Sequence, residues 1–566
     1  MTDPKTYGDS WYAATMANAP QRPSLTWDLD ADVCVIGGGL AGLTAAREIA
    51  RSGWSVVLLE GGRIASGASG RNTGFVLPGF GVDAERLVER VGFDRTKDLW
   101  TLAQGGLDYV RDIVKAEGAS GIDPQPGWLH VSRTNNNDEF VADIALLGEL
   151  GCDIEGWSAE RVRGVLRSER YFYAVNYLRA FTIHPVNYAQ KLAAAAERDG
   201  ARIFENTPAV SIDPTGVRKR IVTPHARLRA DHVILCGNVQ LGGLMPKIAA
   251  TLMPMTTYVV TTAPLGDALT EAIRYPGGVS DSDTPDNHYR VVGGDRLMLS
   301  GRATSWVRNP RRYIKALTGD IKKTYPQLGD VAIDYAWNGT LGLTLHRMPQ
   351  IGELGGGVWL ASGFGGHGLN TTAMAGNLIA RAIVAGDETW RQFTPFELVW
   401  AGGAIGRAAA QARVFVKRLR LAVGERRARA RERARLKALA AELTKDAALV
   451  EQNKQAIVAE QASPPASEPI AAEAPQVPAV VAQEPTQETS QHSIQEPIAE
   501  PVQETVQEAT IAPSSIVPPA MEEASTMPSP EVAAVTEPPE QALSESEAPR
   551  SKRKKRKLRA KTDAKA

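Results

Sequence analysis

The chain has 566 residues, of which 43% are hydrophobic, and its 64 basic side chains balance its 64 acidic ones. This length exceeds a single domain, and the apolar content is sufficient for a large core. No apolar run reaches the roughly 18 residues of a membrane span, and the three cysteines lack the spacing of metal ligands. A membrane-spanning segment and a cysteine-based metal site are therefore excluded. With no signal-like apolar stretch in residues 1–10, we expect a cytoplasmic protein in a reducing compartment.

A strand, a glycine turn, a helix and a second strand are predicted in turn between residues 31 and 60. Gly37 allows a tight turn, Gly39 leaves room for a pyrophosphate, and Gly42 lets the helix pack closely on the sheet. The free N–H groups at the helix N-terminus favour phosphate. Glu60 follows the second strand, where a carboxylate accepts hydrogen bonds from ribose hydroxyls. With these features in register, the sequence predicts a dinucleotide-binding fold.

The loop from Gly61 to Gly74 contains mostly small residues and two arginines, which suits a large cofactor lying along the backbone. Its pattern Gly-Ala-Ser-Gly-Arg-Asn-x-Gly resembles the FAD-dependent oxidoreductases of the D-amino-acid oxidase and glycine oxidase superfamily, in the branch that contains gamma-glutamylputrescine oxidoreductase. The resemblance begins near Ser10 and extends to about residue 420. An exposed loop is the alternative for two of these side chains, Arg71 and Asn72. The resemblance implies an FAD cofactor that contacts Arg63, Ser69, Arg71 and Asn72.

Two later segments are assigned to the cofactor by the same resemblance. In the family, the backbone at the position of Val210 holds the adenine. A glycine-rich turn before a predicted apolar helix is expected at the pyrimidine end of the flavin, where N–H groups and the helix dipole stabilise the negative charge of the reduced ring. That turn supplies the expected contacts Gly363, Gly365, Gly366, His367 and Gly368.

We predict an α/β fold with α+β character, in which a Rossmann-type FAD-binding domain is interleaved with a substrate domain built on an antiparallel sheet. Alternating apolar and polar residues predict strands of that sheet at 255–262, 288–292 and 296–302. The predicted FAD-binding domain comprises residues 31–104, 184–244 and 346–400, and the substrate domain comprises 105–183 and 245–345. Outside them lie an N-terminal extension (1–30), a basic helical extension (401–450), a disordered acidic tail (451–549) and a basic C-terminus (550–566).

The chemistry of such a protein belongs to the flavin, so the protein has to place a substrate carbon over N5 and tune the ring. In the family, a neutral amine loses a hydride to the flavin, the imine hydrolyses, and dioxygen reoxidises the cofactor with release of hydrogen peroxide. This route requires no dedicated base. His367 is expected beside the flavin, and Trp337 resembles a position near the pocket wall. A packed histidine and an ordinary core aromatic are the respective alternatives.

Three further residues were considered by the same resemblance. His184 and the proline after it match a family pair that we interpret as structural. Arg302 could bind a substrate carboxylate, but a surface ion pair is the favoured interpretation. Some family members attach FAD covalently to a late cysteine or an early histidine; here residues 340–347 contain no cysteine and 61–74 contain no histidine. Non-covalent FAD is therefore expected, with His346 as the residue that leaves the alternative open.

The end of the chain is divided by charge. Residues 401–450 hold 13 basic and 4 acidic side chains, 451–549 hold 17 acidic side chains and one lysine, and 550–566 hold 10 basic and one acidic. The first block is rich in helix formers, and either lies on an anionic membrane or, as we favour, docks on the enzyme and continues as a solvated basic rod. The second is too polar to fold. The third suits nucleic acid, anionic lipid or the chain's own acidic stretch.

Two classes of function remain. The leading one is oxidation of a primary amine such as gamma-glutamylputrescine, or of an amino acid, with oxygen as the acceptor. Within the enzymes, the alternatives are a sarcosine-like secondary-amine oxidase and an amino-acid dehydrogenase that passes electrons to a quinone, at the membrane periphery. The non-enzyme alternative is a flavin-domain protein targeted by its charged tail, which the intact FAD motifs disfavour.

Overall fold

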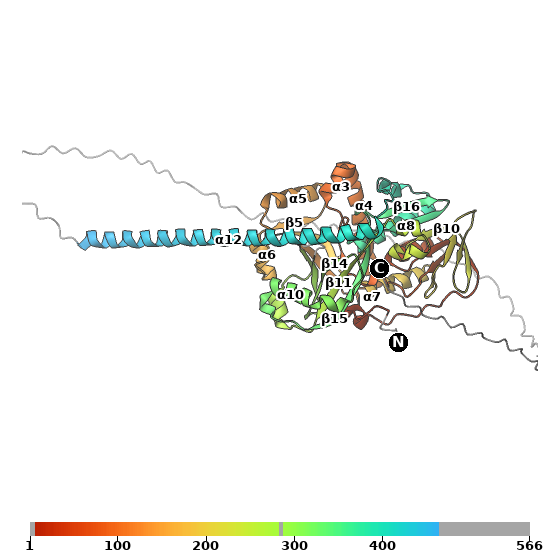
Figure 1. Ribbon diagram of the computed structural model, residues 1–566, viewed down its shortest axis with the longest axis horizontal. Helices are drawn as coiled ribbons and strands as arrows, with labels where there is room; N and C mark the ends of the chain where they lie inside the picture. The colour runs from red at the N-terminus through yellow and green to blue at the C-terminus, as the bar shows by residue number, and fades with distance from the viewer. Residues whose placement is uncertain (1–5, 282–286, 463–566) are drawn as a thin grey trace, which may run out of the picture. The chain divides into compact units, whose positions relative to one another are not determined.

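The computed structural model describes residues 6–281 and 287–462 (Figure 1). Most of the predicted acidic tail and all of the predicted basic C-terminus lie outside these residues. The described chain is organised around two β-sheets, which we call sheet A and sheet B. The predicted fold class, an α/β protein with a dinucleotide-type unit, is confirmed.

Sheet A contains the predicted strand–helix–strand unit and is mostly parallel. Its central strands pair in parallel, whereas an edge strand and a hairpin add antiparallel pairs. In order across the sheet the described strands are β16 (Gln350–Gly355), β17 (Val358–Ser362), β10 (Arg227–Leu235), β1 (Leu29–Ile36), β2 (Val56–Leu59) and β7 (Arg202–Phe204), with the hairpin β8 (Ser211–Asp213) and β9 (Lys219–Val222) attached to β10.

Alternate residues of β1 face opposite sides of sheet A, as the two-residue period of a strand requires. Val33 and Val35 pack in the main hydrophobic core with the helices that cover one face. Cys34 and Ile36 pack in a second core on the other face. Cys34 is fully buried, and burial raises the pKa of its thiol. It serves as a small apolar residue, as predicted.

Helices cover sheet A and the outer face of sheet B. The long helix that follows the second glycine turn packs between the helix of the predicted strand–helix–strand unit and a 25-residue helix. The described helices before residue 400 are α1 (Trp11–Thr15), α2 (Leu40–Arg51), α3 (Ala84–Val91), α4 (Phe93–Glu117), α5 (Asn137–Glu149), α6 (Ala159–Leu166), α7 (Pro185–Arg198), α8 (Pro246–Ala249), α9 (Asp267–Ala272), α10 (Ile314–Thr324) and α11 (Gly368–Ala385). Short 3-10 turns cover Ala68–Gly70, Asn238–Gly243, Pro310–Tyr313, Pro326–Leu328 and Thr389–Phe393.

Sheet B contains the three strands that alternation predicted, at nearly the predicted bounds. One strand from the predicted FAD-binding segment 31–104, β3 (Phe75–Val76), also joins this sheet through β6 (Tyr173–Thr182). The pair of β12 (Gly278–Asp281) with β4 (Gln125–Ser132) is parallel, so the sheet is not wholly antiparallel as predicted. In order the described strands are β15 (Ile333–Leu343), β11 (Met253–Thr262), β14 (Arg296–Thr304), β13 (His288–Val292), β12 (Gly278–Asp281), β4 (Gln125–Ser132), β6 (Tyr173–Thr182) and β3 (Phe75–Val76), with β5 (Ile154–Trp157) beside β6.

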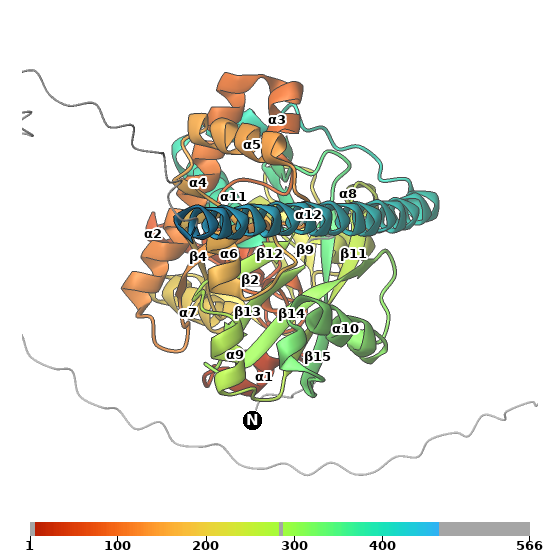
Figure 2. The same ribbon diagram turned by 90° about the vertical axis from the view of Figure 1, so that its left-hand side faces the viewer.

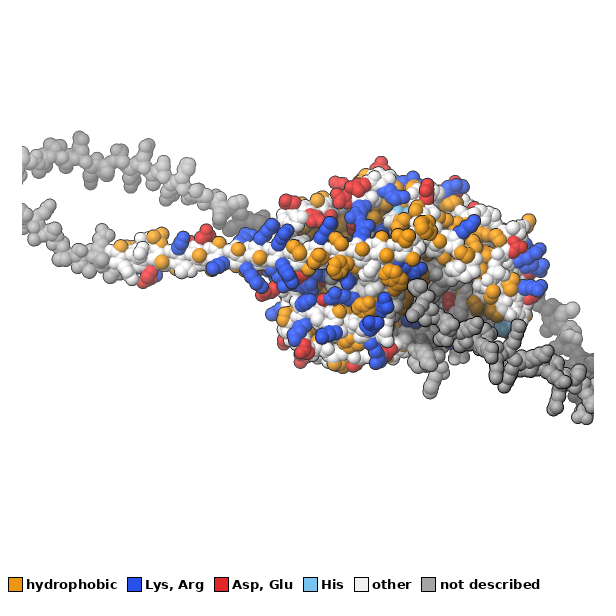
Figure 3. All heavy atoms as spheres, in the orientation of Figure 1, with side chains coloured by type: hydrophobic (Ala, Val, Ile, Leu, Met, Phe, Trp, Pro, Cys, Tyr) orange, Lys and Arg blue, Asp and Glu red, His pale blue; other side chains and the backbone are white. Residues whose placement is uncertain are grey.

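A single helix, α12 (Gly403–Ala462), forms the predicted basic extension and continues twelve residues past the predicted end at 450. Figures 1 and 2 show it crossing over sheet B and running on beyond the other described elements. Every side chain from 433 to 457 is exposed. Lysine and arginine side chains line much of its visible surface (Figure 3). The helix therefore has a docked segment followed by a solvated basic rod, as the favoured prediction held.

Ion pairs fasten the docked part of α12. Glu425 forms ion pairs with Arg170 at 2.8 Å and Arg133 at 3.4 Å, and Glu432 pairs with Arg163 at 2.7 Å. Burial alone would raise the pKa of Glu425, but the hydrogen bond and charge of Arg170 hold it below its ordinary value. Within the described part of the chain, no helix has the length and apolar character needed to cross a membrane.

Candidate active site

The turn after β1 has the geometry that its glycine motif predicts. Gly37 adopts a φ of +114°, in the left-handed region that favours glycine. A Cβ on Gly42 would stand 2.1 Å from the carbonyl oxygen of Gly37, so a larger residue would push α2 away from the turn. Both the tight turn and the close helix packing are present.

The N-terminus of α2 faces Ser69 from the loop after β2. Ser69 Oγ accepts a hydrogen bond from the backbone N–H of Leu40 at 3.1 Å. A Cβ on Gly39 would stand 3.0 Å from the same oxygen. A helix N-terminus bordered by a hydroxyl and a bare α carbon is a suitable place for phosphate. The structure therefore brings Gly39 and Ser69 together where the pyrophosphate is expected.

Glu60 lies at the end of β2 and turns its carboxylate toward the glycine turn. Its two oxygens accept hydrogen bonds from the backbone N–H groups of Gly38 and Gly62, each at 2.7 Å. Burial raises the pKa of this carboxyl, and the two amide donors act in the opposite direction. Backbone donors thus hold the carboxylate at the edge of the site, where the ribose contact is expected.

Arg63 is engaged by a buried carboxylate. Its Nε forms an ion pair with Glu205 at 2.7 Å, and one terminal N–H donates to the carbonyl of Pro20 at 3.2 Å. Glu205 is fully buried and also accepts a hydrogen bond from the backbone N–H of Ile64. Sequence reasoning did not single out Glu205, which ties the loop after β2 to the end of β7. Contact between Arg63 and the cofactor stays a prediction.

The side chains of Arg71 and Asn72 hold their own loop in shape. Arg71 donates hydrogen bonds to the carbonyls of Ser66 at 2.8 Å and Thr6 at 2.9 Å. Asn72 Nδ2 donates to the carbonyl of Ser69 at 2.7 Å. Both side chains are part-buried and engaged, so the alternative of freely solvated side chains is wrong. Their contact with FAD stays a prediction.

Trp337 is a buried residue of β15 that reaches this loop. Its side chain packs edge-on against Tyr12, with ring centroids 5.7 Å apart. Its indole Nε1 donates a hydrogen bond to the carbonyl of Arg71 at 3.1 Å. The structure therefore places Trp337 in the core, as the alternative interpretation held, while joining it to the loop expected to contact FAD.

Val210 lies just before β8, and 56% of its surface is exposed. Its backbone N–H donates to the carbonyl of Val222 at 2.7 Å. Because this N–H is already hydrogen-bonded within the hairpin, an adenine contact at Val210 would have to be made by its backbone carbonyl. The adenine contact stays a prediction.

The second glycine turn leads into the N-terminus of α11. Gly363 and Gly365 adopt φ values of +73° and +61°. Apart from chain neighbours and the adjacent helix backbone, no atom of the described residues lies within 4 Å of where a Cβ on Gly366 or Gly368 would stand. His367 occupies the N-cap position, and its buried Nδ1 has no hydrogen-bond partner among the described residues. Open space beside an unsatisfied polar atom is expected where a ligand completes a site.

Sheet B presents aromatic side chains to this turn, and sequence reasoning missed them. The Trp128 ring stacks on Tyr177 with centroids 4.3 Å apart and lies 6.3 Å from the ring of His367. Trp128 Nε1 donates to Ser280 Oγ at 2.7 Å, and that hydroxyl lies 2.6 Å from Nδ1 of His288. This network brings four strands of sheet B, β4, β6, β12 and β13, to the N-terminus of α11.

The signal for this cluster was a two-residue alternation in segment 125–132. Leu129 and Val131 pack in the core on the outer face of sheet B. Trp128 and His130 occupy the alternate positions and therefore face the other side. Their rings lie 5.6 Å apart. The alternation was the available signal that Trp128 and His130 share the face opposite that outer core, where Trp128 packs in the main hydrophobic core.

The histidines of the cluster are uncharged at neutral pH. Burial lowers the pKa of His288 to about 3 and that of His367 to about 4, and repulsion by neighbouring histidines adds to both shifts. Burial also lowers the pKa of His130. No group of three side chains suited to a metal ion occurs in the described part of the chain. The cluster therefore offers neutral hydrogen-bonding groups among aromatic rings.

Two residues that we interpreted as structural are structural. His184 caps α7, its Nδ1 accepting from the N–H of Asn187 at 3.1 Å, with proline at the next position. Arg302 pairs with Asp320 and is not free for a substrate carboxylate.

Comparison with known proteins identifies the family. The family model described as "FAD dependent oxidoreductase" (DAO) matches residues 32–382, more than half of the chain. The chain belongs to this family. The enzyme is 32% identical over 392 residues to gamma-glutamylputrescine oxidoreductase of Escherichia coli (strain K12), covering 68% of this chain and 91% of that protein. It is also 32% identical over 378 residues to a probable oxidoreductase OrdL of Rhizobium meliloti (strain 1021), covering 66% and 87%.

Solved structures agree on the fold. Glycine oxidase from Geobacillus kaustophilus matches with a TM-score of 0.55 at 19% sequence identity, covering 65% of this chain and 98% of that one. L-proline dehydrogenase from P. horikoshii matches with a TM-score of 0.55 at 18% identity, covering 66% and 100%. The enzyme is thus an FAD-dependent oxidoreductase of amines or amino acids.

The residues present fit FAD. The α2 N-terminus with Gly39 and Ser69 suits the pyrophosphate. The bare α carbons of Gly366 and Gly368 leave open space beside the α11 N-terminus for the flavin ring. These two glycine turns follow β1 and β17, which both pair with β10 of sheet A.

Proposed function

We propose that this enzyme oxidises a primary amine, with gamma-glutamylputrescine the first candidate and an amino acid the second. FAD bound at the glycine turns would accept a hydride at N5 and pass electrons to oxygen, giving hydrogen peroxide. The oxidised amine is an imine, which water converts to an aldehyde or, from an amino acid, an oxo acid. The observation that carries the proposal is the unpartnered Nδ1 of His367, on a ring that lies 6.3 Å from the ring of Trp128 in sheet B.

The residues around His367 suit a neutral amine. His367 Nδ1 has no partner among the described residues and would accept a hydrogen bond from a substrate N–H, which would orient the nitrogen lone pair. Trp128 and Tyr177 form an apolar wall that excludes water from the reacting carbon. Because His367 and His288 are uncharged, the site holds no imidazolium that would repel an amine. The sequence match to gamma-glutamylputrescine oxidoreductase supports the choice of first substrate.

The test is anaerobic bleaching of the flavin followed by peroxide assay in air. Gamma-glutamylputrescine, sarcosine, and D- and L-amino acids are compared at equal concentration. We expect the primary amine to bleach fastest and to yield peroxide and aldehyde in equal amounts. Faster reduction by sarcosine would favour the secondary-amine alternative. No reduction by any of these compounds would contradict the proposal.

The pH dependence of reduction separates substrate from protein titration. An alkyl ammonium loses its proton near pH 10, so the reduction rate should rise with pH up to that region. His367→Gln should slow reduction by at least about tenfold, the upper part of the range for one hydrogen bond. The exposed His225→Gln serves as the matched control and should behave as wild type. Reoxidation by a quinone but not by oxygen would establish the dehydrogenase alternative.

We propose in addition that FAD is bound without a covalent link. Both ring nitrogens of His346 are engaged by the protein: Nδ1 accepts from the N–H of Met348 at 3.2 Å, and Nε2 lies 3.2 Å from the carbonyl of Glu397. A histidine held in this way is a poor candidate for flavin attachment. The absence of cysteine from residues 340–347 supports the same conclusion.

The exposed part of α12 supports a further proposed contact. Its arginines and lysines after residue 432 have no role in docking on sheet B. Together with the basic segment 550–566, they would attract an anionic membrane surface or a nucleic acid. Such binding should weaken steeply with added salt.

A further inference from the structure

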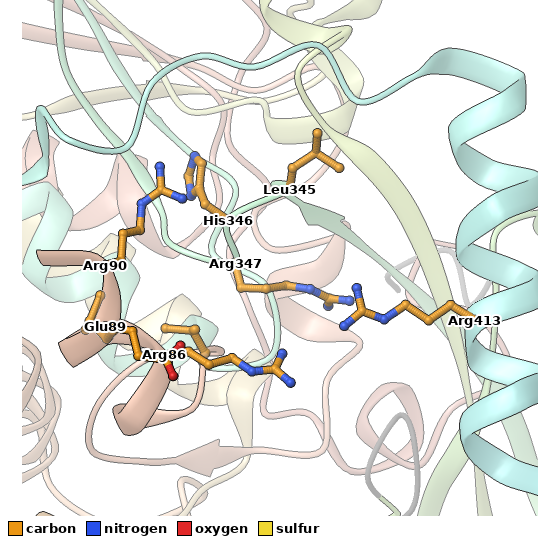
Figure 4. A pocket seen from close by; sticks show the side chains of 9 residues that line it. Arg86, Glu89, Arg90, Leu345, His346, Arg347 and Arg413 are labelled. Carbon is orange, nitrogen blue, oxygen red and sulfur yellow. The ribbon is translucent and has the colours of Figure 1, made fainter. Parts of the chain in front are cut away.

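A positively charged pocket of about 400 Å³ opens beside the active site (Figure 4). Its walls come from α3, from the turn 345–347 and from α12. Its volume lies in the range of small-molecule sites. Among the described lining residues, four are arginines and one, Glu89, is acidic: the arginines are Arg86, Arg90, Arg347 and Arg413.

Two of these arginines form no side-chain hydrogen bond or ion pair among the described residues, and a third is hydrogen-bonded only to a backbone carbonyl. Arg86 pairs with Asp83 at 3.5 Å, and Arg90 donates to a backbone carbonyl. Arg347 and Arg413 form no ion pair or hydrogen bond through their side chains among the described residues. Figure 4 shows their guanidinium groups pointing toward one another. Two adjacent unpaired cations form a receptor for an anion, which can accept hydrogen bonds from both.

The pKa of Arg347 also reflects the positive charges around it. Burial lowers the pKa of its guanidinium, and repulsion by Arg413 and Arg86 lowers it further, while Asp83 acts in the opposite direction. Arginine stays charged in proteins. Both side chains are exposed, so solvent screens much of this repulsion, and an anion between the guanidinium groups would reduce it further.

Contacts on both sides of Arg413 fix its place. Gln411 accepts a hydrogen bond from the backbone N–H of Ser305 at 3.0 Å. Val414 packs against the cluster of Met255, Ala303 and Leu343. Arg413 is therefore presented by a docked turn of α12 and not by its exposed rod. It also lies outside residues 32–382, which match the family model.

The pocket and the active site share one short segment. Val82 lines the pocket, and Gly81 precedes it. A Cβ on Gly81 would stand 3.5 Å from the backbone nitrogen of Gly366 and 3.9 Å from Nδ1 of His367. The same point lies 3.8 Å from the carbonyl oxygen of Arg347. One residue thus separates the pocket wall from the imidazole expected at the flavin.

We propose that this pocket binds the carboxylate at the end of the amine substrate remote from the oxidised carbon, through Arg347 and Arg413. The inference rests on the proposed function and narrows it to amines that carry a distant carboxylate. Gamma-glutamylputrescine has its carboxylate carbon ten bonds from its terminal nitrogen, about 12 Å when extended, roughly the span of three to four extended residues. Glu89 lines the same pocket and pairs with the ammonium beside that carboxylate.

The first test compares two amines that share the reacting end. Gamma-glutamylputrescine carries the carboxylate, whereas N-acetylputrescine does not. We expect wild type to prefer the former by at least about 30-fold in kcat/KM, mainly through KM, because charge-assisted hydrogen bonds to a carboxylate are strong. Arg347→Gln and Arg413→Gln should each bring this ratio down by about tenfold or more.

Arg427→Gln is the matched control. It removes an exposed arginine from the same helix, about 21 Å along the axis from Arg413, and should keep the wild-type ratio. A wild-type ratio near one, or equal losses for both amines in the pocket variants, would overturn the inference.

A direct binding measurement tests the affinity of the pocket for a carboxylate without requiring turnover. Glutarate is titrated calorimetrically into the oxidised holoenzyme, and inorganic phosphate is titrated in parallel. Wild type and Arg427→Gln should bind glutarate, and the two pocket variants should bind it at least about tenfold more weakly. Absence of glutarate binding, or tighter binding of phosphate, would overturn the carboxylate assignment even if amines are oxidised. Glutarate binding with no amine oxidation would instead overturn the proposed function.

Discussion

The indole of Trp337 donates its hydrogen bond to the carbonyl of Arg71, across a sequence separation of 266 residues. This bond joins β15 of sheet B to the loop after β2 of sheet A. The α carbon of Gly339, two residues along β15, also approaches this loop, since a Cβ there would stand 3.2 Å from Arg71 Cβ. The two sheets are therefore held together at the loop that is expected to contact FAD.

Replacing Trp337 with phenylalanine tests whether this residue positions the loop or contacts substrate. The ring still fills the core, but the Arg71 carbonyl loses its donor, at a cost of about 1 kcal/mol. We expect FAD to bind roughly fivefold more weakly, with KM for the amine unchanged at saturating FAD. Flavin fluorescence measures the binding, and Trp306→Phe, at a half-exposed site, is the control. A raised KM with normal FAD affinity would indicate substrate contact instead.

The two glycines at the start of α2 should respond differently to substitution. Gly39→Val places methyl groups in front of the helix N-terminus, where the pyrophosphate is expected, so the protein should fold but lose FAD. Gly42→Ala places Cβ 2.1 Å from the carbonyl oxygen of Gly37, so the fold itself should lose stability, with an expected loss of about 2 kcal/mol or more.

Circular dichroism and flavin absorbance of each purified variant separate the two outcomes. Gly105→Ala, in the middle of α4 with open space around it, is the control and should be as stable as wild type or slightly more stable. Full FAD occupancy in Gly39→Val would mean that the motif has been misinterpreted.

Release of the flavin tests the mode of attachment. Denaturation of the purified yellow protein by acid or heat should leave all FAD in the supernatant, because the described protein already engages both ring nitrogens of His346. Absorbance of the supernatant and of the redissolved precipitate measures the partition. Flavin that stays with the polypeptide would disprove non-covalent binding, and His346→Gln would then identify the attachment site.

The strand–helix–strand unit could be predicted because its signals are local. The apolar runs and glycines between 31 and 60 lie within the elements that they specify, and the observed bounds of β1, α2 and β2 follow them. The glycine turn before α11 was assigned by resemblance to the family, although its glycines and the apolar run that follows are also local signals. Such features depend on backbone conformation and on neighbours a few residues away.

The aromatic and histidine cluster could not be predicted in the same way, because it depends on strand pairing. Trp128 meets Ser280 across 152 residues, through a parallel pair of β4 with β12 that no local signal specifies. The ion pair between Glu425 and Arg170 likewise joins residues that are 255 positions apart in the sequence. The end of α12 was predicted too early because alanine and glutamate favour a helix past the point where the composition changes.

His184 makes stability depend on pH. Burial lowers its pKa to about 3, and protonation of Nδ1 would remove the cap of α7. The unfolded chain binds a proton near pH 6.5 whereas the folded protein does not, so the contribution is complete above pH 6.5 and is lost as the pH falls toward 3. From pH 7.5 to pH 5.0 the loss is about 2 kcal/mol.

Denaturant unfolding of wild type and His184→Gln at these two pH values isolates that contribution. The free energy of unfolding of the variant should fall by about 2 kcal/mol less than that of wild type, since glutamine does not titrate. Equal losses in the two proteins would show that His184 is accessible to protons in the folded state.

Truncation separates the docked part of α12 from its rod. Among the described residues, the last ion pair that joins α12 to another element is that of Glu432 with Arg163 of α6, and every side chain from 433 to 457 is exposed. A chain ending after residue 450 should therefore keep FAD binding and turnover, whereas a chain ending after 402 leaves Arg170 and Arg133 without Glu425 and should be less stable. Thermal unfolding and peroxide release measure both effects.

Vesicle binding tests the basic C-terminal segment. If residues 550–566 carry binding to anionic vesicles, that binding should disappear in the chain that ends after residue 450, while turnover continues. Lost turnover after truncation at 450 would show that the tail is part of the enzyme.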